Sequence, residues 1–284
     1  MTEDFDYDLV VIGSGPAGQR GAVAAAKLGK RVAIVDQREL VGGVCLHTGT
    51  IPSKTLREAI LYLSGYRQRT FYGQDYSLKE QLGIADLTFR VQSVMARELE
   101  VIRSQLKRNN VTTLCGSAAF AGPQCLEVTG PGDTVSRVRA AHVLVACGTR
   151  PARSSTIPFD GVRFLDSDQV LQMQELPREM IVIGAGVVGL EYASMFSALG
   201  VRVSVVDARE QLLEFVDREL IEMLCHVMRQ QNATFRLGDA LEHVDVDARG
   251  RIVARLASQR VVRGDVLLYS AGRQTNADRL NLAA

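Results

Sequence analysis

The stretch VVIGSGPAGQRGAVAAAKLGKRVAIVD, residues 10–36, decides the fold, and it occurs a second time as IVIGAGVVGLEYASMFSALGVRVSVVD, residues 181–207. The two copies align without a gap, glycine on glycine, and both end on an aspartate. Each copy combines a β-branched run, a helical stretch and a second apolar strand, which is the context in which G-x-G-x-x-G binds a dinucleotide. Two copies predict two dinucleotides, with electrons passing from one to the other.

Each position of the repeat has a physical role. The first glycine permits the tight turn out of the strand, the second lets the backbone approach a pyrophosphate, and the third lets the helix pack on the sheet. The helix then points its N-terminal amides at the phosphates, and the closing aspartate accepts hydrogen bonds from ribose hydroxyls. These residues are Gly13, Gly15, Gly18 and Asp36 in the first copy, and Gly184, Gly186, Gly189 and Asp207 in the second. The neighbouring loop residues that we expect to bind cofactor are Ser14, Pro16, Ala17, Val187 and Val188. For either copy alone, an α/β turn without a ligand is the alternative.

Composition sets the broad class of protein. The chain has 284 residues, which predicts about two domains, and its 46% hydrophobic and 23% charged residues are ordinary for a globular core. A net charge of +1 gives no reason to expect nucleic acid or membrane partners. The acidic N-terminus is not a signal peptide, and no apolar run reaches the ~18 residues of a membrane span. The five cysteines form no C-x-x-C pair, which argues against a metal site or disulfide framework. We expect a soluble, cytoplasmic protein without a metal.

Periodicity predicts the remaining elements. Pro52 can start a helix, and residues 87–106 keep apolar side chains three to four positions apart, as an amphipathic helix does. The basic residues of that helix favour a solvated outer face over a phosphate-binding patch; they are Arg90, Arg97, Arg103, Lys107 and Arg108. We expect a β-meander or hairpin over 111–139 and an apolar strand over 142–147. Strands are also expected near 234–237, 251–256 and 260–269.

Three further motifs join the repeat: GGVCLHTGTIPSK at 42–54, ACGTRP at 146–151 and AGR at 271–273. With them, the whole chain resembles the flavoprotein disulfide reductases, the family of glutathione reductase and dihydrolipoamide dehydrogenase. The resemblance implies that the first copy binds FAD and the second binds NAD(P)H. It adds these candidate cofactor-binding residues: Gly42, Gly43, Val44, Cys45, Lys54, Gly116, Ala118, Ala146, Cys147, Gly148, Glu191 and Gly272.

The resemblance also implies a domain arrangement. The fold class is α/β, with two Rossmann-like dinucleotide-binding domains of which the second is inserted in the first. We expect the first FAD-binding segment over 1–152, the NAD(P)-binding domain over 153–273, and the start of the returning FAD-domain segment over 274–284. In the family, a C-terminal domain follows and makes a homodimer. We therefore expect a C-terminally truncated chain.

One departure from the pattern of the disulfide reductases points to a particular subfamily. Disulfide reductases carry two cysteines five positions apart, which relay electrons to a sulfur substrate. Here Cys45 holds the first position and Thr50 the second, and a threonine hydroxyl cannot form a disulfide. This pattern, followed by IPSK, is similar to that of the soluble, Si-specific pyridine nucleotide transhydrogenases, which pass hydride between NADPH and NAD⁺ through FAD. Open alternatives are an NAD(P)H oxidase or quinone reductase (diaphorase), a relative of dihydrolipoamide dehydrogenase, and an inactive dinucleotide-binding fragment.

Catalytic candidates follow from the same resemblance. Lys54 corresponds to a lysine near the flavin N5 and Glu191 to its ion-pair partner, and Cys45 completes the set. The alternatives are a helix-surface lysine, a solvent-facing glutamate in the first helical turn, and a cysteine that is a small apolar residue. His47 suits a structural role better than an acid–base role.

The nucleotide preference of the second copy is open. Asp207 favours NAD(H), because a carboxylate binds a 2′-hydroxyl and repels a 2′-phosphate. Arg202 or Arg209 could instead meet a 2′-phosphate. We expect FAD as the cofactor and both NAD(H) and NADP(H) as substrates, in a site that is a compromise between them.

Overall fold

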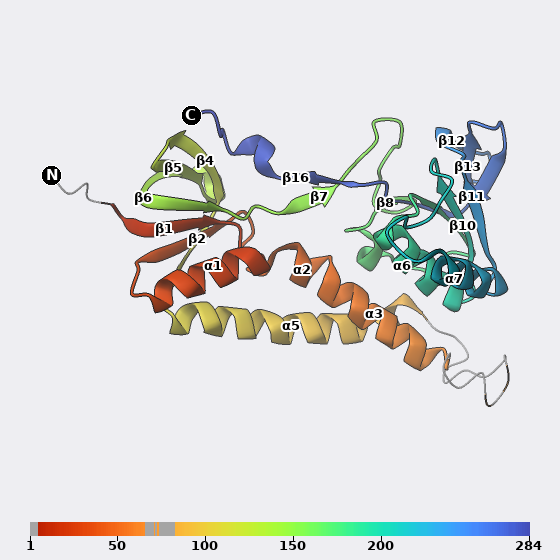
Figure 1. Ribbon diagram of the computed structural model, residues 1–284, viewed down its shortest axis with the longest axis horizontal. Coiled ribbons are helices and arrows are strands. Elements are labelled where there is room, and N and C mark those ends of the chain that lie inside the picture. Colours follow the sequence, from red (N-terminus) through yellow and green to blue (C-terminus); the bar gives the residue numbers. More distant parts are fainter. Residues whose placement is uncertain (1–4, 66–70, 72, 74–82) are drawn as a thin grey trace. The chain divides into compact units, whose positions relative to one another are not determined.

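The computed structural model of the chain describes residues 5–65, 71, 73 and 83–284. The chain divides into two compact units (Figure 1). Unit 1 consists of Met1–Pro52, Gln92–Arg150 and Thr275–Ala284, and unit 2 of Ser53–Val91 and Pro151–Gln274. Both units are α/β structures built around a sheet with parallel strands, as the repeat predicts.

Unit 1 contains a mixed sheet in the order β3-β2-β1-β6-β5-β4. Its strands are β1 (Tyr7–Ile12), β2 (Val32–Asp36), β3 (Thr112–Cys115), β4 (Ser117–Gly122), β5 (Cys125–Thr129) and β6 (Val135–Val145). The pairs β1–β2, β2–β3 and β1–β6 are parallel, whereas β4–β5 and β5–β6 are antiparallel. The carboxyl ends of β1 and β2 therefore lie at one edge of the sheet, where ligands bind in such folds.

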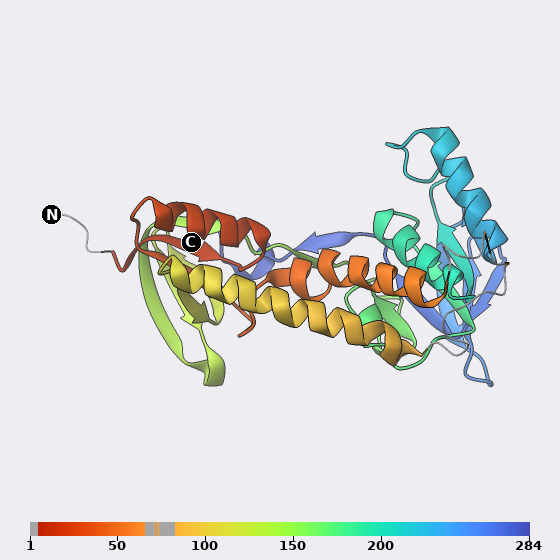
Figure 2. The same cartoon turned by 90° about the horizontal axis from the view of Figure 1, so that it is seen from below.

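Both faces of the central strands are covered. Val10 and Ile12 pack into a core with the strands of the meander, whereas Val11 packs on the other face with residues of α1 (Pro16–Lys27) and α5 (Ile84–Arg108). Figures 1 and 2 show α1 and the C-terminal half of α5 side by side on that face. Burial on both sides explains why β1 and β2 read as continuous apolar runs. The predicted helix over 87–106 is confirmed within α5, and its five predicted basic residues are exposed.

Two strand predictions in unit 1 are wrong in detail. The meander expected over 111–139 and the strand expected over 142–147 share one continuous strand, β6 (Val135–Val145). Its first half pairs with β5 and its second half with β1, so it joins the antiparallel part of the sheet to the parallel part. Thr112–Cys115 pairs with β2 in the main sheet and is not part of the meander.

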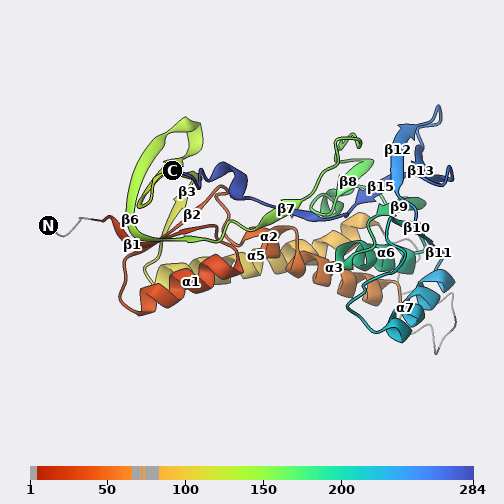
Figure 3. The same cartoon turned by 45° about the horizontal axis from the view of Figure 1, so that its top comes forward.

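Unit 2 repeats the plan with a parallel sheet in the order β11-β10-β9-β15-β8. Its strands are β8 (Phe164–Asp166), β9 (Glu179–Ile183), β10 (Arg202–Asp207), β11 (Ala233–Leu237) and β15 (Val266–Tyr269). A separate antiparallel sheet contains β12 (Leu241–Val246), β13 (Ile252–Leu256) and β14 (Val261–Gly264). Figure 3 shows α6 (Val187–Ala198) and α7 (Arg218–Gln230) on one side of the parallel sheet and β12 and β13 on the other.

Some elements of unit 2 differ from those that the sequence predicts. The run over 260–269 is two strands, β14 and β15, which lie in different sheets. The strands β8 and β12 and the helix α7 were not expected. Helix α7 begins after Asp217, whose carboxylate accepts a hydrogen bond from the backbone N–H of Glu219 as an N-cap does.

Short elements complete the described chain. Helices α2 (Gly43–His47) and α3 (Thr50–Leu63) follow β2, and Pro52 lies in the first turn of α3. Strands β7 (Thr149–Pro151) and β16 (Arg273–Thr275) form a two-stranded sheet. Short 3-10 helices lie at Pro131–Asp133, Val170–Gln172 and Ala277–Arg279. Within the described residues, no helix has both the length and the apolar character needed to cross a membrane.

Candidate functional site

The first fingerprint loop leaves β1 in a conformation that requires glycine. Gly13 has φ +104°, and a Cβ there would overlap the carbonyl oxygen of Ala146. A Cβ on Gly18 would overlap the carbonyl oxygen of Gly13. The loop is therefore packed backbone to backbone, against the helix on one side and against the turn after β6 on the other.

The second loop has the same geometry. Gly184 has φ +99°, and a Cβ there would lie 2.7 Å from the backbone nitrogen of Ala271, while a Cβ on Gly189 would overlap Gly184. The N–H of the first glycine donates to the carbonyl of the next parallel strand in both loops, at 2.8 Å from Gly13 to Val35 and 2.8 Å from Gly184 to Val206. The sequence repeat is thus a repeat of structure.

The middle glycine of each loop faces open space. A Cβ on Gly15 or on Gly186 would meet nothing within 4 Å. Each of these glycines is also the N-cap of its helix, α1 or α6, and neither helix has a side-chain hydrogen bond at its cap. A helix N-terminus with uncapped amides and room above it suits the pyrophosphate of a dinucleotide. Both loops therefore fit the group that the fingerprint predicts.

Ser14 connects several of the predicted residues of unit 1. Its backbone N–H and its hydroxyl both donate to Oδ2 of Asp36, at 2.8 and 2.5 Å, and its Oγ accepts from the N–H of Gly42 at 2.9 Å. Ser14 is fully buried. The buried hydroxyl therefore joins the fingerprint loop, the strand-end aspartate and the GG turn into one network.

The GG turn lies against the fingerprint loop. A Cβ on Gly43 would lie 2.8 Å from the Cα of Gly15. Val44 and Cys45 follow in α2 and are half-buried, and no disulfide involves Cys45. The ring of His47 contacts the carbonyl oxygen of Val41 at 3.0 Å, through Nε2. This contact closes the turn and gives the histidine a structural role.

The other candidates of unit 1 fall into two groups. Gly116 donates its N–H to the carbonyl of Asp36 at 2.8 Å, so it lies beside the strand-end aspartate. The carbonyls of Cys147 and Gly148 accept hydrogen bonds from Asn276. Ala118, in contrast, packs in the core between the meander and the main sheet. Its side chain is thus part of the core.

The catalytic candidates Lys54 and Glu191 meet in unit 2. The Lys54 ammonium donates to Oε1 of Glu191, and the hydroxyl of Ser53 lies 3.3 Å from the same oxygen. The Glu191 side chain is 17% exposed and that of Lys54 59% exposed. Glu191 is therefore not the solvent-facing glutamate of the alternative reading. Ser53 lies in the IPSK motif but is not among the site residues predicted from the sequence.

Asp207 at the end of β10 lies in a cationic setting. Its Oδ2 accepts from the N–H of Ala185 at 2.6 Å and from Nη2 of Arg209 at 2.7 Å, and its Oδ1 accepts from the N–H and Nε of Arg209 at 2.9 and 3.0 Å. Burial by itself would raise the pKa of this carboxyl, but the hydrogen bonds from Arg209 and Ala185 outweigh it and lower the pKa to about 2.

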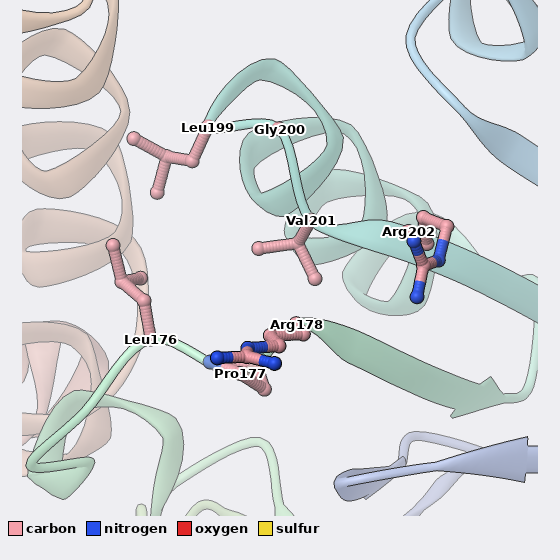
Figure 4. Close-up of a pocket in the computed structure, with 7 residues that line it drawn as sticks. All are labelled: Leu176, Pro177, Arg178, Leu199, Gly200, Val201 and Arg202. Carbon is pink, nitrogen blue, oxygen red and sulfur yellow. The ribbon is translucent and has the colours of Figure 1, made fainter.

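Arg202 lies at the other end of the same strand. It is the first residue of β10 and Asp207 is the last, which places their backbones about 16 Å apart at the usual strand rise. The Arg202 guanidinium pairs with Glu179, so Arg202 is not available to a nucleotide at the carboxyl end. Arg202 belongs instead to a surface pocket of about 410 Å³ (Figure 4). The pocket is lined by Leu176, Pro177, Arg178, Leu199, Gly200, Val201 and Arg202.

The remaining candidates of unit 2 surround the second loop. Val187 and Val188 begin α6 and are exposed and half-buried, respectively. Gly272 has φ +134° in the turn that follows β15. Ser270 of that turn, which the sequence did not point to, donates its hydroxyl to the carbonyl of Gly184 at 2.9 Å. It thereby fixes the first glycine of the loop from the side of β15.

Comparison with known proteins shows the family to which the chain belongs. Residues 7–284 match the family described as pyridine nucleotide-disulphide oxidoreductase. A soluble pyridine nucleotide transhydrogenase of Mycobacterium bovis is 48% identical over 278 residues, which cover 98% of this chain and 59% of that protein. A protein of the same name from Colwellia psychrerythraea is 36% identical over 284 residues, or 100% of this chain and 60% of that protein.

A solved structure also matches almost the whole chain. LpdA of Mycobacterium tuberculosis superposes with a TM-score of 0.87 at 25% identity, covering 97% of this chain and 61% of that one. The chain thus spans about three fifths of the length of the relatives it matches. Because the family model matches residues 7–284 and both glycine cradles are present, the chain belongs to the pyridine nucleotide-disulphide oxidoreductase family.

Proposed function

We propose that this chain carries the dinucleotide sites of an FAD-dependent oxidoreductase that transfers hydride between NADPH and NAD⁺ through the flavin. The observation that carries the proposal is the pair of cradles with matching geometry, at Gly13–Gly18 and Gly184–Gly189. One cradle suits the flavin nucleotide and the other suits the nicotinamide nucleotides, which use it in turn. The names of the relatives from Mycobacterium bovis and Colwellia psychrerythraea support the transhydrogenase reading.

A bound flavin supplies a centre that takes hydride from one nicotinamide nucleotide and returns it to another. The residues of the chain bind and orient the two nucleotides. The N-termini of α1 and α6 hold the pyrophosphates through backbone N–H groups. Asp36, fixed by Ser14, holds the adenosine ribose of FAD.

Lys54 is the residue we propose for stabilising the negative charge that reduced flavin carries, since a fixed cation lowers the energy of developing charge. Glu191 keeps the ammonium in one position through the ion pair. Ser53 holds the same carboxylate oxygen from the preceding residue. The lysine is thus oriented before nucleotide arrives, which limits reorganisation during hydride transfer.

A disulfide relay has no place in this proposal. Cys45 has Thr50 five positions on, where a disulfide reductase needs its second cysteine. A single thiol cannot store the two electrons of a hydride as an internal disulfide. A bound flavin would therefore have to exchange hydride directly with the nicotinamide nucleotides that the second cradle would hold.

The test follows the visible absorbance of the purified chain, loaded with FAD and kept without oxygen. Added NADPH should bleach the flavin band, and NAD⁺ added afterwards should restore it with one NADH formed per NADPH consumed. Recovery by oxygen or a quinone but not by NAD⁺ would show an oxidase or a quinone reductase. A chain that retains no FAD after incubation would be an inactive fragment, and the proposal would fail for it.

A further inference from the structure

The two strand-end aspartates occupy the same position of the repeat but differ in their free acceptor capacity. An ionised carboxylate offers about four lone-pair sites. Asp36 receives hydrogen bonds from the N–H and Oγ of Ser14 and from the N–H of Arg38. One acceptor site of Asp36 therefore stays open for a ribose hydroxyl.

Asp207 has no such open site. It receives four hydrogen bonds, one from the N–H of Ala185 and three from Arg209. A 2′-hydroxyl could donate to Asp207 only by displacing one of them. All four acceptor sites of the carboxylate are thus used by the fingerprint loop and by Arg209.

The group that faces outward here is the guanidinium. The Asp207 side chain is 8% exposed, whereas that of Arg209 is 52% exposed. The Nε and one Nη of Arg209 donate to Asp207, which leaves the other N–H donors of the five in a guanidinium for a ligand. Guanidinium N–H groups in a planar fork fit phosphate oxygens.

We propose that Arg209, and not Asp207, contacts the 2′ position of the adenosine ribose in the second cradle, so that this cradle binds NADP(H) more tightly than NAD(H). Asp207 is a positioning residue that holds the guanidinium. The inference rests on the proposed use of this cradle for nicotinamide nucleotides. It reverses the preference that the aspartate by itself indicates. NAD(H) still binds, because a hydroxyl can accept a weaker hydrogen bond from the same donors.

The test uses 5′-AMP and adenosine 2′,5′-bisphosphate as probes of the full chain, with binding measured by titration calorimetry. FAD is kept saturating so that the first cradle is filled. The wild-type chain should bind the bisphosphate about tenfold more tightly, which is the usual effect of a charge-assisted pair. Arg209→Gln should remove that advantage and change AMP binding by less than about twofold. Arg209→Lys should keep part of it, since lysine keeps the charge but loses the fork.

Arg202→Gln is the matched control, because Arg202 is an exposed, ion-paired arginine at the far end of the same strand, beside the pocket of Figure 4. It should leave both affinities unchanged. Equal weakening of both probes by Arg209→Gln, or tighter binding of AMP by the wild-type chain, would overturn the inference and leave the nucleotide cradle standing. Failure of the wild-type chain to bind NADH, NADPH and both probes would overturn the proposed function together with the inference.

Discussion

The ammonium of Lys54 donates to the carboxylate of Glu191 across 137 residues of sequence. Lys54 lies in the first turns of α3, and Glu191 lies in α6 behind the second fingerprint loop. The Lys54 side chain remains 59% exposed, so the pair contributes little to stability, under about 1 kcal/mol. Its position in the IPSK motif makes it a candidate for a role in chemistry.

Lys54→Met should therefore slow flavin reduction by NADPH about 100-fold and leave the unfolding free energy nearly unchanged. Stopped-flow absorbance of the FAD-loaded chain without oxygen measures the rate. Arg57→Met is the control, because Arg57 of the same helix also forms an exposed ion pair, with Glu58. If both variants slow reduction equally, Lys54 has no special role.

The glycines of the second loop should separate folding from binding. Gly189→Ala places a methyl group against the Gly184 carbonyl and should lower the unfolding free energy by about 3 kcal/mol or more. Gly186→Ala places it in open space, at φ −74°, where alanine is not strained. That variant should melt near the wild-type temperature and bind NADH about tenfold more weakly, because the methyl group occupies the approach of the pyrophosphate. Unimpaired binding by Gly186→Ala would contradict the assignment of the cradle.

Acid should weaken unit 2 through Asp207. The folded-state pKa of about 2 lies below the ordinary aspartate value near 3.9, so this carboxylate stabilises the fold above about pH 4. That contribution, at most about 3 kcal/mol, is lost as the pH falls from about 4 to about 2. Asp207→Asn should therefore be less stable than wild type at pH 6, with the difference shrinking by pH 3. Urea unfolding at the two pH values measures it, and a difference that stays constant would contradict the pKa.

Ser14→Ala tests the network of unit 1. The buried hydroxyl donates to Asp36 and accepts from the N–H of Gly42, and its loss leaves these groups without that partner. The variant should lose about 1–3 kcal/mol of unfolding free energy and retain FAD less tightly during gel filtration. Ser136→Ala, at an exposed serine of β6, should do neither. Equal FAD retention by both variants would mean that Ser14 does not organise the site.

The sequence alone could predict the central strands and the main helix of unit 1. The apolar runs of β1 and β2 and of β9 and β10 are buried on both faces of their sheets, so their composition reports their position. The three-to-four spacing over 87–106 likewise matches the buried face of α5. In both cases the pattern of apolar residues within one segment of sequence is enough to indicate which side chains are buried.

The ends of several strands, in contrast, are set by the strands with which they pair. One strand, Val135–Val145, joins the parallel and antiparallel parts of its sheet because β1 and β5 pair with its different halves. The run over 260–269 divides because Val266–Tyr269 pairs with β9 whereas Val261–Gly264 pairs with β13. Hydrogen-bond partners distant in sequence set these limits, and local propensity does not contain them.

The site divides in the same way. The sequence by itself predicted the two glycine cradles, because the glycine spacing belongs to one strand–turn–helix unit. The clash that requires the first glycine of each loop comes from outside that unit, from Ala146 after β6 and from Ala271 after β15. Only the tertiary structure decided that Arg209 donates hydrogen bonds to Asp207, while Arg202 pairs with Glu179 at the far end of β10. Only it joined Lys54 to Glu191 from separate segments, a pair that the family resemblance indicated and no spacing did. The sequence gives the charge of each side chain. Whether that charge is exposed, buried or neutralised depends on which other groups the fold brings into contact with it.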